Sequence, residues 1–523
     1  MGFIAHARGR TSRLTLTLVA AAALIGGSAA VPATAAPAGV TAGAAPAALP
    51  HGWPSIQLYA PRLHQKIAVF GGRSFIDPSI YIEARGAALQ FDVQRKNFAE
   101  PETITQVIHS GGVTQQRPIG SWALNGWKGL SRFYRITITD SHGKVLSSRV
   151  FTFCPDTYAP QRATPDSPAK SPYQTSCSFS TPFLLGEVWG IAKGWGVDPA
   201  QFGYGNLNLK LKVGQTYTAT MSITKAWRGV LRMTPREATA TVKLQAVKPS
   251  QCNPCTFRSQ VKPAARPNPA SKRHETAAAM QRVQLTSSPP KSVLPDLKPL
   301  PSWGITLLNR PKTKSAKASS QLAFGATVAV LGNGPLDVEG FSTHHSAIMP
   351  AYQYYWRGNK VVGRTRAGTM GFDNKKGHNH WHFEQFAQYR LLSKNKKTVV
   401  RSQKVGFCIA PTDGVDMLLP HATWQPTYTG FTGECGAPGA LWVQEMMPVG
   451  WGDTYFQYVA GQSFNVTNLH NGVYYIEIIA NPERVLHELS TANDTSLREV
   501  IIGGTPGHRT VRVPAYHGID PEH

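Results

Sequence analysis

Short runs of β-favouring residues, interrupted by glycine, proline and asparagine, recur along the whole chain. Examples are FYRITIT, TYTATMSI, ATVAVLG and YYIEIIA. β-branched and aromatic residues favour extended backbone, whereas glycine and proline end regular elements. The sequence has no long segment with the 3.6-residue period of an amphipathic helix. This pattern predicts an all-β protein built of antiparallel β-sandwich domains.

The same order of patterns occurs twice. The first half reads GAALQFDV, ITQVIHSGGVTQQRPIG and FYRITITDSHGKVLSSRVFTFC, and the second reads GNGPLDVEG, AYQYYWRGNKVVGRTRAGTM and AQYRLLSKNKKTVVRSQKVGFC. Each half then reaches a second cysteine, a GWG tripeptide and another strand-like run. Ordered matches with cysteines in register indicate an internal duplication. We therefore expect two β-sandwich-like domains, at residues 50–248 and 295–503, followed by a C-terminal tail at 504–523.

A basic segment separates the two halves. Residues 249–294 include KPAARPNPASKR and TSSPPKS, and the whole chain has a formal net charge of +25. Low apolar content with excess charge is typical of a flexible linker. An exposed linker of this kind could contact an anionic cell wall or another polyanion. No recognition helix, zinc finger or RNA-stacking motif accompanies it, so nucleic acid is not expected as a partner.

The N-terminus predicts export. Three arginines precede the apolar run LTLTLVAAAALIGG, and Ala33-Thr34-Ala35 forms an A-x-A cleavage signal. This arrangement is typical of a secretory signal peptide, here residues 1–35, with an uncleaved anchor as the alternative. The apolar run is short for a bilayer span, and no later segment is apolar enough. We expect a secreted protein without a transmembrane segment.

The six cysteines suit an oxidising compartment. They fall into three sequence-local pairs: Cys154 with Cys177, Cys252 with Cys255, and Cys408 with Cys435. Locality is the only reason to favour these disulfides over other pairings. A zinc site at Cys252-x-x-Cys255 is the alternative for the middle pair, with His274 as the nearest further ligand.

Three histidines occupy alternate positions in GHNHWHFEQF. In a strand, His378, His380 and His382 would share one face at spacings of roughly 7 Å, while Trp381 would face the core. Some twist would let the three imidazoles converge on one ion, whereas a helix would separate His380 from the others. Three imidazoles without a thiolate suit copper, zinc, iron or nickel, and their spacing does not choose among these metals. A polar strand surface without a metal is the alternative.

The first half provides an internal comparison for these residues. Where the second half has GHNHWHFEQFAQYR, the first has ALNGWKGLSRFYR, without histidine. Counting back from the cysteine, Lys404 in KVGFC corresponds to Val150 in VFTFC. Tyr455 follows the second GWG in Asp-Thr-Tyr, but the nearest tyrosine after the first GWG, Tyr204, is displaced. We expect the first half to be catalytically inactive, and to pack against the second half or present substrate to it.

Together these motifs resemble the catalytic domain of the lysyl oxidase family. GHNHWHFEQFAQYRL, KVGFC and GDTYF follow LPDL and GNGPLDVEG in order, over about residues 295–503. The resemblance implies that His378, His380 and His382 bind copper. It also implies that Lys404 and Tyr455 become joined as the cofactor lysyl tyrosylquinone.

The family pattern is not matched throughout. Animal members have a histidine where this chain has Lys375, and they carry more cysteines. These departures indicate a distant secreted member of bacterial type, and they argue against assuming collagen or elastin as the substrate.

The implied activity is that of a copper amine oxidase. Such an enzyme would convert peptidyl lysine or other primary amines to aldehydes, consuming dioxygen and releasing hydrogen peroxide. A redox-active metal can oxidise a phenol, and a lysine amine can then add to the oxidised ring. Redox-inert zinc cannot do this. The residue types do not identify the general base, because Asp453 could equally cap a turn.

Two other functions remain open at the level of sequence. One is a non-catalytic, extracellular copper-binding adhesion module. The other is a zinc hydrolase, which the lack of an H-E-x-x-H helix and of a nucleophile elbow disfavours.

Overall fold

Strands dominate the computed structural model, which describes residues 53–522 apart from 111, 158, 201–206, 253–275, 343–345, 375–378, 403, 405 and 427–434. The helices α1 (Lys225–Leu231) and α2 (Ala277–Gln281) are short. The predicted all-β class is therefore confirmed. None of the helices in these described ranges has the length and apolar character needed to cross a membrane. The predicted signal peptide lies outside the described residues.

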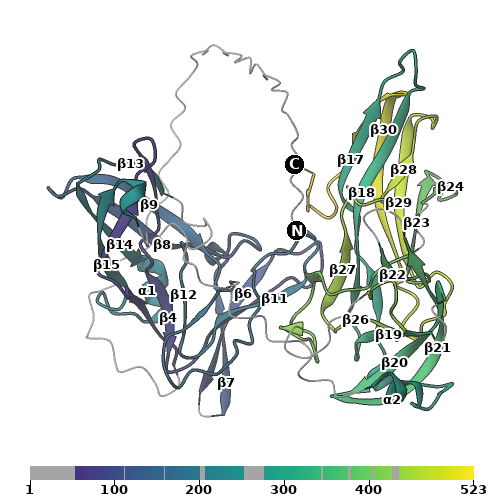
Figure 1. The fold of residues 1–523 in the computed structure, drawn as a ribbon, viewed down its shortest axis with the longest axis horizontal. Coiled ribbons are helices and arrows are strands. Elements are labelled where there is room, and N and C mark those ends of the chain that lie inside the picture. Colours follow the sequence, from purple (N-terminus) through teal and green to yellow (C-terminus); the bar gives the residue numbers. More distant parts are fainter. Residues whose placement is uncertain are drawn as a thin grey trace, which may run out of the picture. The chain divides into compact units, whose positions relative to one another are not determined.

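The first half contains four sheets (Figure 1). Their strands, in pairing order, are β1 (Ser55–Tyr59), β4 (Tyr81–Arg85), β12 (Trp195–Val197) and β10 (Gln161–Arg162); β11 (Gly186–Ile191), β5 (Leu89–Gln94), β6 (Thr103–Ser110) and β7 (Val113–Ile119); β13 (Leu207–Lys210) and β3 (Arg73–Ile76); and β2 (His64–Ala68), β15 (Thr239–Val247), β14 (Thr216–Ile223), β8 (Leu130–Thr139) and β9 (Val145–Phe153).

The second half contains three sheets. The first comprises β16 (Leu297–Pro299), β18 (Ser319–Val330), β27 (Trp451–Tyr455) and β25 (Asp413–Gly414), with β17 (Trp303–Arg310) and β28 (Ser463–Asn465) also paired to β18. The second runs β22 (His380–Phe383), β21 (Lys360–Asp373), β20 (Ile348–Arg357), β19 (Leu336–Phe341) and β26 (Trp442–Met447). The third runs β24 (Thr398–Arg401), β23 (Ala387–Ser393), β29 (Gly472–Ala480), β30 (Thr495–Thr505) and β31 (His508–Arg512), and β23, β29 and β30 lie side by side in Figure 1.

A chain of aromatic rings links the core of the second half to the β27 strand. Phe324 stacks on Phe464 and meets Tyr389 edge to face. Tyr389 contacts Phe407, whose ring meets that of Tyr455 edge to face with centroids 5.2 Å apart. Each such pair contributes about 0.5–1.5 kcal/mol beyond the burial of its area. The end of β27 is therefore held against a rigid, packed core.

Two predicted disulfides are present. Cys154 is bonded to Cys177, and Cys408 to Cys435. Cys252 is also disulfide-bonded, which contradicts the zinc alternative for this cysteine, and Cys255 lies outside the described residues.

The C-terminal part of the predicted linker, residues 276–294, packs against the second half. Met280 in α2 is buried and its carbonyl accepts a hydrogen bond from the Tyr354 hydroxyl at 3.0 Å. Further along, Val293 is buried and packs with Tyr355. The apolar residues of this stretch are too few and too unevenly spaced to give a periodic signal, which is why the sequence did not show that it joins the second half. Residues 253–275 of the predicted linker lie outside the described residues.

The predicted C-terminal tail is also largely structured. Strand β31 pairs with β30, and Tyr516 packs edge to face against Phe183 with ring centroids 5.6 Å apart. The alternating pattern of HRTVRV was too short to be recognised as a strand.

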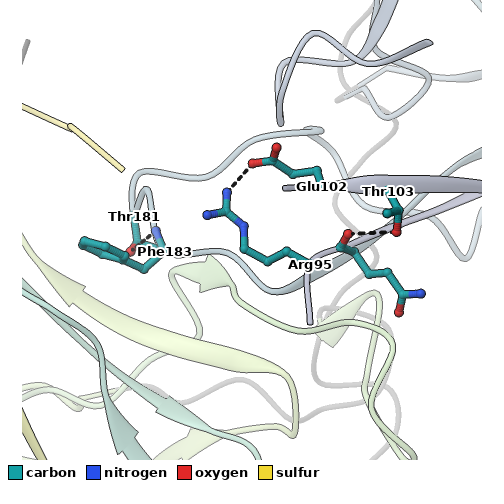
Figure 2. Close-up of polar contacts among 6 residues, drawn as sticks. Arg95, Glu102, Thr103, Thr181 and Phe183 are labelled. Atoms are coloured by element: carbon teal, nitrogen blue, oxygen red, sulfur yellow. Dashed lines mark hydrogen bonds and ion pairs between the residues drawn. The ribbon is translucent and has the colours of Figure 1, made fainter. Parts of the chain in front are cut away.

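Backbone hydrogen bonds connect the two halves of the chain. The Leu185 amide donates to the Val415 carbonyl, and the Met417 amide donates to the Gly186 carbonyl, both at 2.7 Å. Polar contacts order the adjacent loops: Arg95 pairs with Glu102, and the Phe183 amide donates to Thr181 Oγ1 at 3.3 Å (Figure 2). The first half therefore contacts the segment that follows Cys408 in the second.

Candidate metal and cofactor site

Two of the three predicted histidines lie on a strand. β22 begins at His380, and its partner β21 faces it with Gly371 opposite His382. The Nε2 atoms of His380 and His382 are 2.9 Å apart, so both rings point toward one place. Asn379 has a φ of 56°, which interrupts regular strand geometry just before β22. His378 lies outside the described residues.

Trp381 fixes this strand from its other face, as the alternation predicts. Its side chain is 1% exposed, and its indole N–H donates to the Ala437 carbonyl at 3.1 Å. Its amide donates to the Cys435 carbonyl at 2.7 Å. The next residue, Phe383, exchanges backbone hydrogen bonds with Phe407. β22 is thus held between the two segments that the Cys408–Cys435 disulfide joins.

Gly406 allows the KVGFC segment to pass directly against a predicted metal ligand. A Cβ built on Gly406 would lie 2.8 Å from the Cβ of His382 and 3.0 Å from its Nδ1. Only glycine fits at this distance without displacing the imidazole. The contact joins segments distant in sequence, so the sequence pattern did not identify it.

The structure brings Lys404 and Tyr455 together. Lys404 Nζ lies 4.1 Å from the centre of the Tyr455 ring and 4.7 Å from that of Phe407. Only 7% of Lys404 is exposed. Burial lowers the pKa of Lys404 to about 8, although Asp453 and Asp373 act in the opposite direction. About a tenth of this amine is therefore neutral and nucleophilic at pH 7, far more than of an exposed lysine.

The backbone of Lys404 is also tightly held. Gly461, at a φ of 84°, would place a Cβ 3.0 Å from the Cβ of Lys404. Ser402 Oγ donates to the Gly461 carbonyl at 2.8 Å and accepts from the Lys404 amide at 3.1 Å. These contacts restrict where the lysine side chain can reach.

Two hydrogen bonds fix the Tyr455 hydroxyl. It donates to the Cys408 carbonyl at 3.1 Å and accepts from the Cys408 amide at 2.8 Å. Burial, then the charges of Asp453 and Glu445, raise the pKa of Tyr455 well above its ordinary value. The phenol is therefore protonated at neutral pH, while part of the residue remains accessible to solvent.

Three carboxyl groups surround this pair, and the sequence analysis assigned a role to none of them. Asp453 shares a face of β27 with Tyr455, is 3% exposed, and its Oδ2 accepts no hydrogen bond from the described residues. Glu445 is fully buried and accepts from the Ile409 amide at 3.0 Å. Asp373 Oδ2 lies 3.9 Å from His382 Nδ1, and its charge also acts on Lys404. Asp453 could have been singled out, because the first half has Val197 at the matching position after GWG.

The metal was tested against the residues present. Within the described ranges, no group of three or more His, Cys, Asp or Glu side chains is arranged to hold a metal ion. Two imidazoles nevertheless converge through their Nε2 atoms, and the predicted third ligand falls in the segment before Asn379. Imidazole nitrogen is a donor that copper accepts readily. The two described imidazoles could therefore supply two of the nitrogen donors of a copper site.

Comparison with known proteins agrees with these motifs. The family model for lysyl oxidase matches residues 364–506, which include the histidine strand, the KVGFC segment and Tyr455. No curated protein matches the chain in sequence. By this match, residues 364–506 form a lysyl oxidase domain within the chain.

Proposed function

We propose that this chain is a secreted copper-dependent amine oxidase of the lysyl oxidase type. It would convert peptidyl lysine or other primary amines to aldehydes, with consumption of dioxygen and release of hydrogen peroxide. Its cofactor would be lysyl tyrosylquinone, formed from Lys404 and Tyr455. The observation that carries the proposal is the position of the Lys404 amine, 4.1 Å from the centre of the Tyr455 ring, in a domain of this family.

His380 and His382 would hold the copper, together with His378. Bound copper would supply the one-electron redox chemistry that links oxidation of a phenol to dioxygen. Asp373 would orient His382, because its carboxylate is the acidic group near His382 Nδ1. Gly406 keeps the space for that imidazole open.

Lys404 supplies the nucleophile for the crosslink. Its lowered pKa means that deprotonation of Nζ, which must precede attack on the oxidised ring, costs less free energy than in an exposed lysine. Forming the bond from nitrogen to a ring carbon releases a proton. We assign Asp453 as its acceptor, because the charge of Asp453 acts on both Lys404 and Tyr455.

Tyr455 supplies the ring and its orientation. The two bonds to the Cys408 backbone hold the phenol oxygen in place, and Phe407 packs against the ring edge. The ring therefore has little freedom to turn away from Lys404. Such restriction lowers the entropic cost of joining two side chains.

Peptide mapping of the chain expressed with copper tests this proposal. We expect a tryptic species that links the peptides of Lys404 and Tyr455, with quinone absorbance and a phenylhydrazine adduct. Lys397→Ala, which removes an exposed lysine on the neighbouring hairpin, should keep the link. Fully copper-loaded protein with both peptides unmodified would refute the oxidase and favour the copper-binding adhesion module instead.

We also propose roles for the parts outside the catalytic domain. Residues 50–248 would be non-catalytic, and residues 1–35 would direct export, so that mature protein begins at Ala36. The basic linker would contact anionic cell-wall material. N-terminal sequencing of protein recovered from the medium tests the export proposal, and an uncleaved N-terminus would contradict it.

A further inference from the structure

One segment of the first half, residues 179–187, lies against the second half. The Leu185 amide donates to the Val415 carbonyl, and the Gly186 carbonyl accepts from the Met417 amide, both at 2.7 Å. Backbone hydrogen bonds of this kind fix the position of one chain segment along another. The segment therefore lies beside the chain that continues from β25.

The side chain of Phe183 anchors this segment. It is fully buried and belongs to one hydrophobic cluster with four residues of the second half: Leu300, Trp303, Ala329 and Val415. The Phe183 amide donates to Thr181 Oγ1 at 3.3 Å, so a side-chain hydrogen bond also restrains the segment (Figure 2). The contact between the halves therefore has an apolar core of its own.

The same segment reaches β27 through β25. These two strands pair with Asp413 opposite Gly452 and Gly414 opposite Trp451. The Phe179 ring meets that of Trp451 edge to face, with centroids 5.5 Å apart. A Cβ added to Gly414 would lie 2.7 Å from the Phe179 ring, so the backbone of β25 approaches this ring as closely as glycine allows. Phe179 therefore touches both strands of the pair.

Asp413 joins the two halves by a buried hydrogen bond. It is 2% exposed, and its Oδ1 accepts from the Ser180 amide at 2.6 Å. Burial raises the pKa of Asp413. Hydrogen bonds from Thr454 of the second half, and from the Ser180 and Thr181 backbone of the first, act in the opposite direction. The carboxylate is thus stabilised from both halves.

The residue before β25 fixes the backbone on either side of Asp453. Thr412 Oγ1 accepts from the Thr454 amide at 2.7 Å and donates to the Gly452 carbonyl at 3.1 Å. Tyr455 ends the same strand, β27. A shift of β25 would therefore displace the tyrosine that is proposed to form the cofactor.

We propose that Phe179 and Asp413 are positioning residues of the oxidase site, and that the first half fixes strand β27 through them. Both act on the backbone that carries Tyr455, and neither has a chemical step of its own. The first half would then contribute to cofactor formation without supplying a reacting group. The link to the oxidase rests on the proposed function, whereas the fixing of β27 does not.

The rate of quinone formation in the metal-free full chain, after saturating copper is added, tests this role. Phe179→Ala removes the ring against Trp451 and should slow formation about tenfold, because small misplacements of reacting groups are costly. Copper affinity should not change, since His380 and His382 lie on β22, in another sheet. Phe179→Leu, which keeps an apolar side chain at this position, should restore most of the rate.

Phe151→Ala is the matched control for loss of an aromatic ring in the first half. Like Phe179, Phe151 is half-buried, but it stacks on Tyr134 of the first half and has no contact with β27 among the described residues. This variant should form the quinone at the parent's rate. Equal slowing in Phe151→Ala and Phe179→Ala would reduce the effect to a general loss of stability in the first half, and would overturn the proposal.

Two variants of Asp413 separate its hydrogen bond from its bulk. Asp413→Asn keeps an oxygen that can accept from the Ser180 amide, and it should retain most of the rate. Asp413→Leu has a similar volume but leaves that amide without its acceptor, and it should slow quinone formation at least tenfold. Equal rates in Asp413→Leu and the parent would remove Asp413 from the positioning residues.

Hydrogen exchange of the β27 amides gives a second measure, which needs no cofactor. In copper-free protein, Phe179→Ala should speed exchange in the peptide that contains β27 and leave the β22 peptide unchanged. An unchanged rate of quinone formation in Phe179→Ala, or copper affinity that falls in step with the rate, would overturn the proposal and leave the oxidase standing. If the wild type forms no quinone, faster exchange in β27 would keep the role of the first half and remove the oxidase, whereas unchanged exchange would refute both.

Discussion

The two halves of the chain share a strand arrangement and differ in chemistry. The sheet order β11-β5-β6-β7 in the first half matches β26-β19-β20-β21 in the second, and β15-β14-β8-β9 matches β30-β29-β23-β24. Each half closes a disulfide between its matching cysteines. These correspondences support the predicted duplication.

The clearest difference is the β22 strand. In the second half this strand extends the sheet beyond β21 and carries His380 and His382. In the first half, β7 is the last strand of its sheet, and a short 3-10 turn at Ser121–Ala123 follows it. A shared strand arrangement thus accommodates a strand with two histidines in one copy and a 3-10 turn in the other, so the arrangement does not depend on the histidine strand.

The largest expected effect comes from removing Lys404, whose counterpart in the first half is Val150. Lys404→Ala should abolish the crosslink and all amine-dependent peroxide release, because no other described lysine lies over the Tyr455 ring. Lys144→Ala, in the corresponding hairpin region of the first half, is exposed and should leave both unchanged. Peroxide assays and peptide mapping measure these outcomes. Peroxide release that survives in Lys404→Ala would contradict the assignment.

Loss of a histidine should act on the metal first. His382→Ala should lower copper affinity by about a hundredfold or more, because changing only a residue that hydrogen-bonds a metal ligand already costs about 10–100-fold. The crosslink should be lost with the copper. Bound copper per chain, measured after dialysis against a chelator, checks this expectation. Full copper retention in His382→Ala would place the ion elsewhere.

A substitution of Asp453 tests whether this residue, which the first half lacks, accepts the proton during crosslink formation. Asp453→Asn should slow formation of the crosslink by about a hundredfold, the usual scale for general acid–base catalysis, without changing bound copper. The rate of quinone absorbance after copper is added to metal-free protein measures the effect. An unchanged rate would reduce Asp453 to a structural role, like that of Val197 in the first half.

A substitution at Gly406 tests how packing against His382 affects copper binding while the histidines themselves are kept. Gly406→Ala should push on His382 and lower copper affinity by about tenfold, with the crosslink slowed in proportion. Gly439→Ala is the matched control, because a Cβ there would meet no atom within 4 Å. Chelator titration of both variants gives the comparison. Equal affinities would mean that the loop yields without moving the imidazole.

Patterns local in sequence predicted the fold class well. FYRITIT, TYTATMSI and YYIEIIA lie in β8, β14 and β29, because alternation and β-branched residues act within a few positions. The two described disulfides were also predicted, since their cysteines lie 23 and 27 residues apart along the chain. The fold class was therefore encoded locally.

Contacts between distant segments were not predictable in the same way. Lys404 and Tyr455 were paired through the family resemblance, and no spacing rule joins a residue outside the strands to one on β27. The fit of Gly406 against His382 and the approach of Asp373 to the same imidazole arise only once β21, β22 and the KVGFC segment are assembled. The sequence did not predict that residues 276–294 are packed, because their structure depends on contacts of a few apolar side chains with distant segments.

The smallest expected effect is the pH dependence of crosslink formation. Burial lowers the pKa of Lys404 to about 8, so the reactive neutral amine increases as pH rises through that value. The rate of formation should therefore rise about fivefold between pH 7 and pH 8, and by less than twofold from pH 8 to pH 9. Metal-free protein given copper at each pH, followed by quinone absorbance, provides the profile. Val150, the counterpart of Lys404 in the first half, cannot titrate. The pH at which the rate reaches half its maximum should therefore reflect the second half alone. A rate that still rose tenfold per unit above pH 9 would show that Lys404 titrates like an ordinary exposed lysine, and would remove the burial on which its nucleophilic role depends.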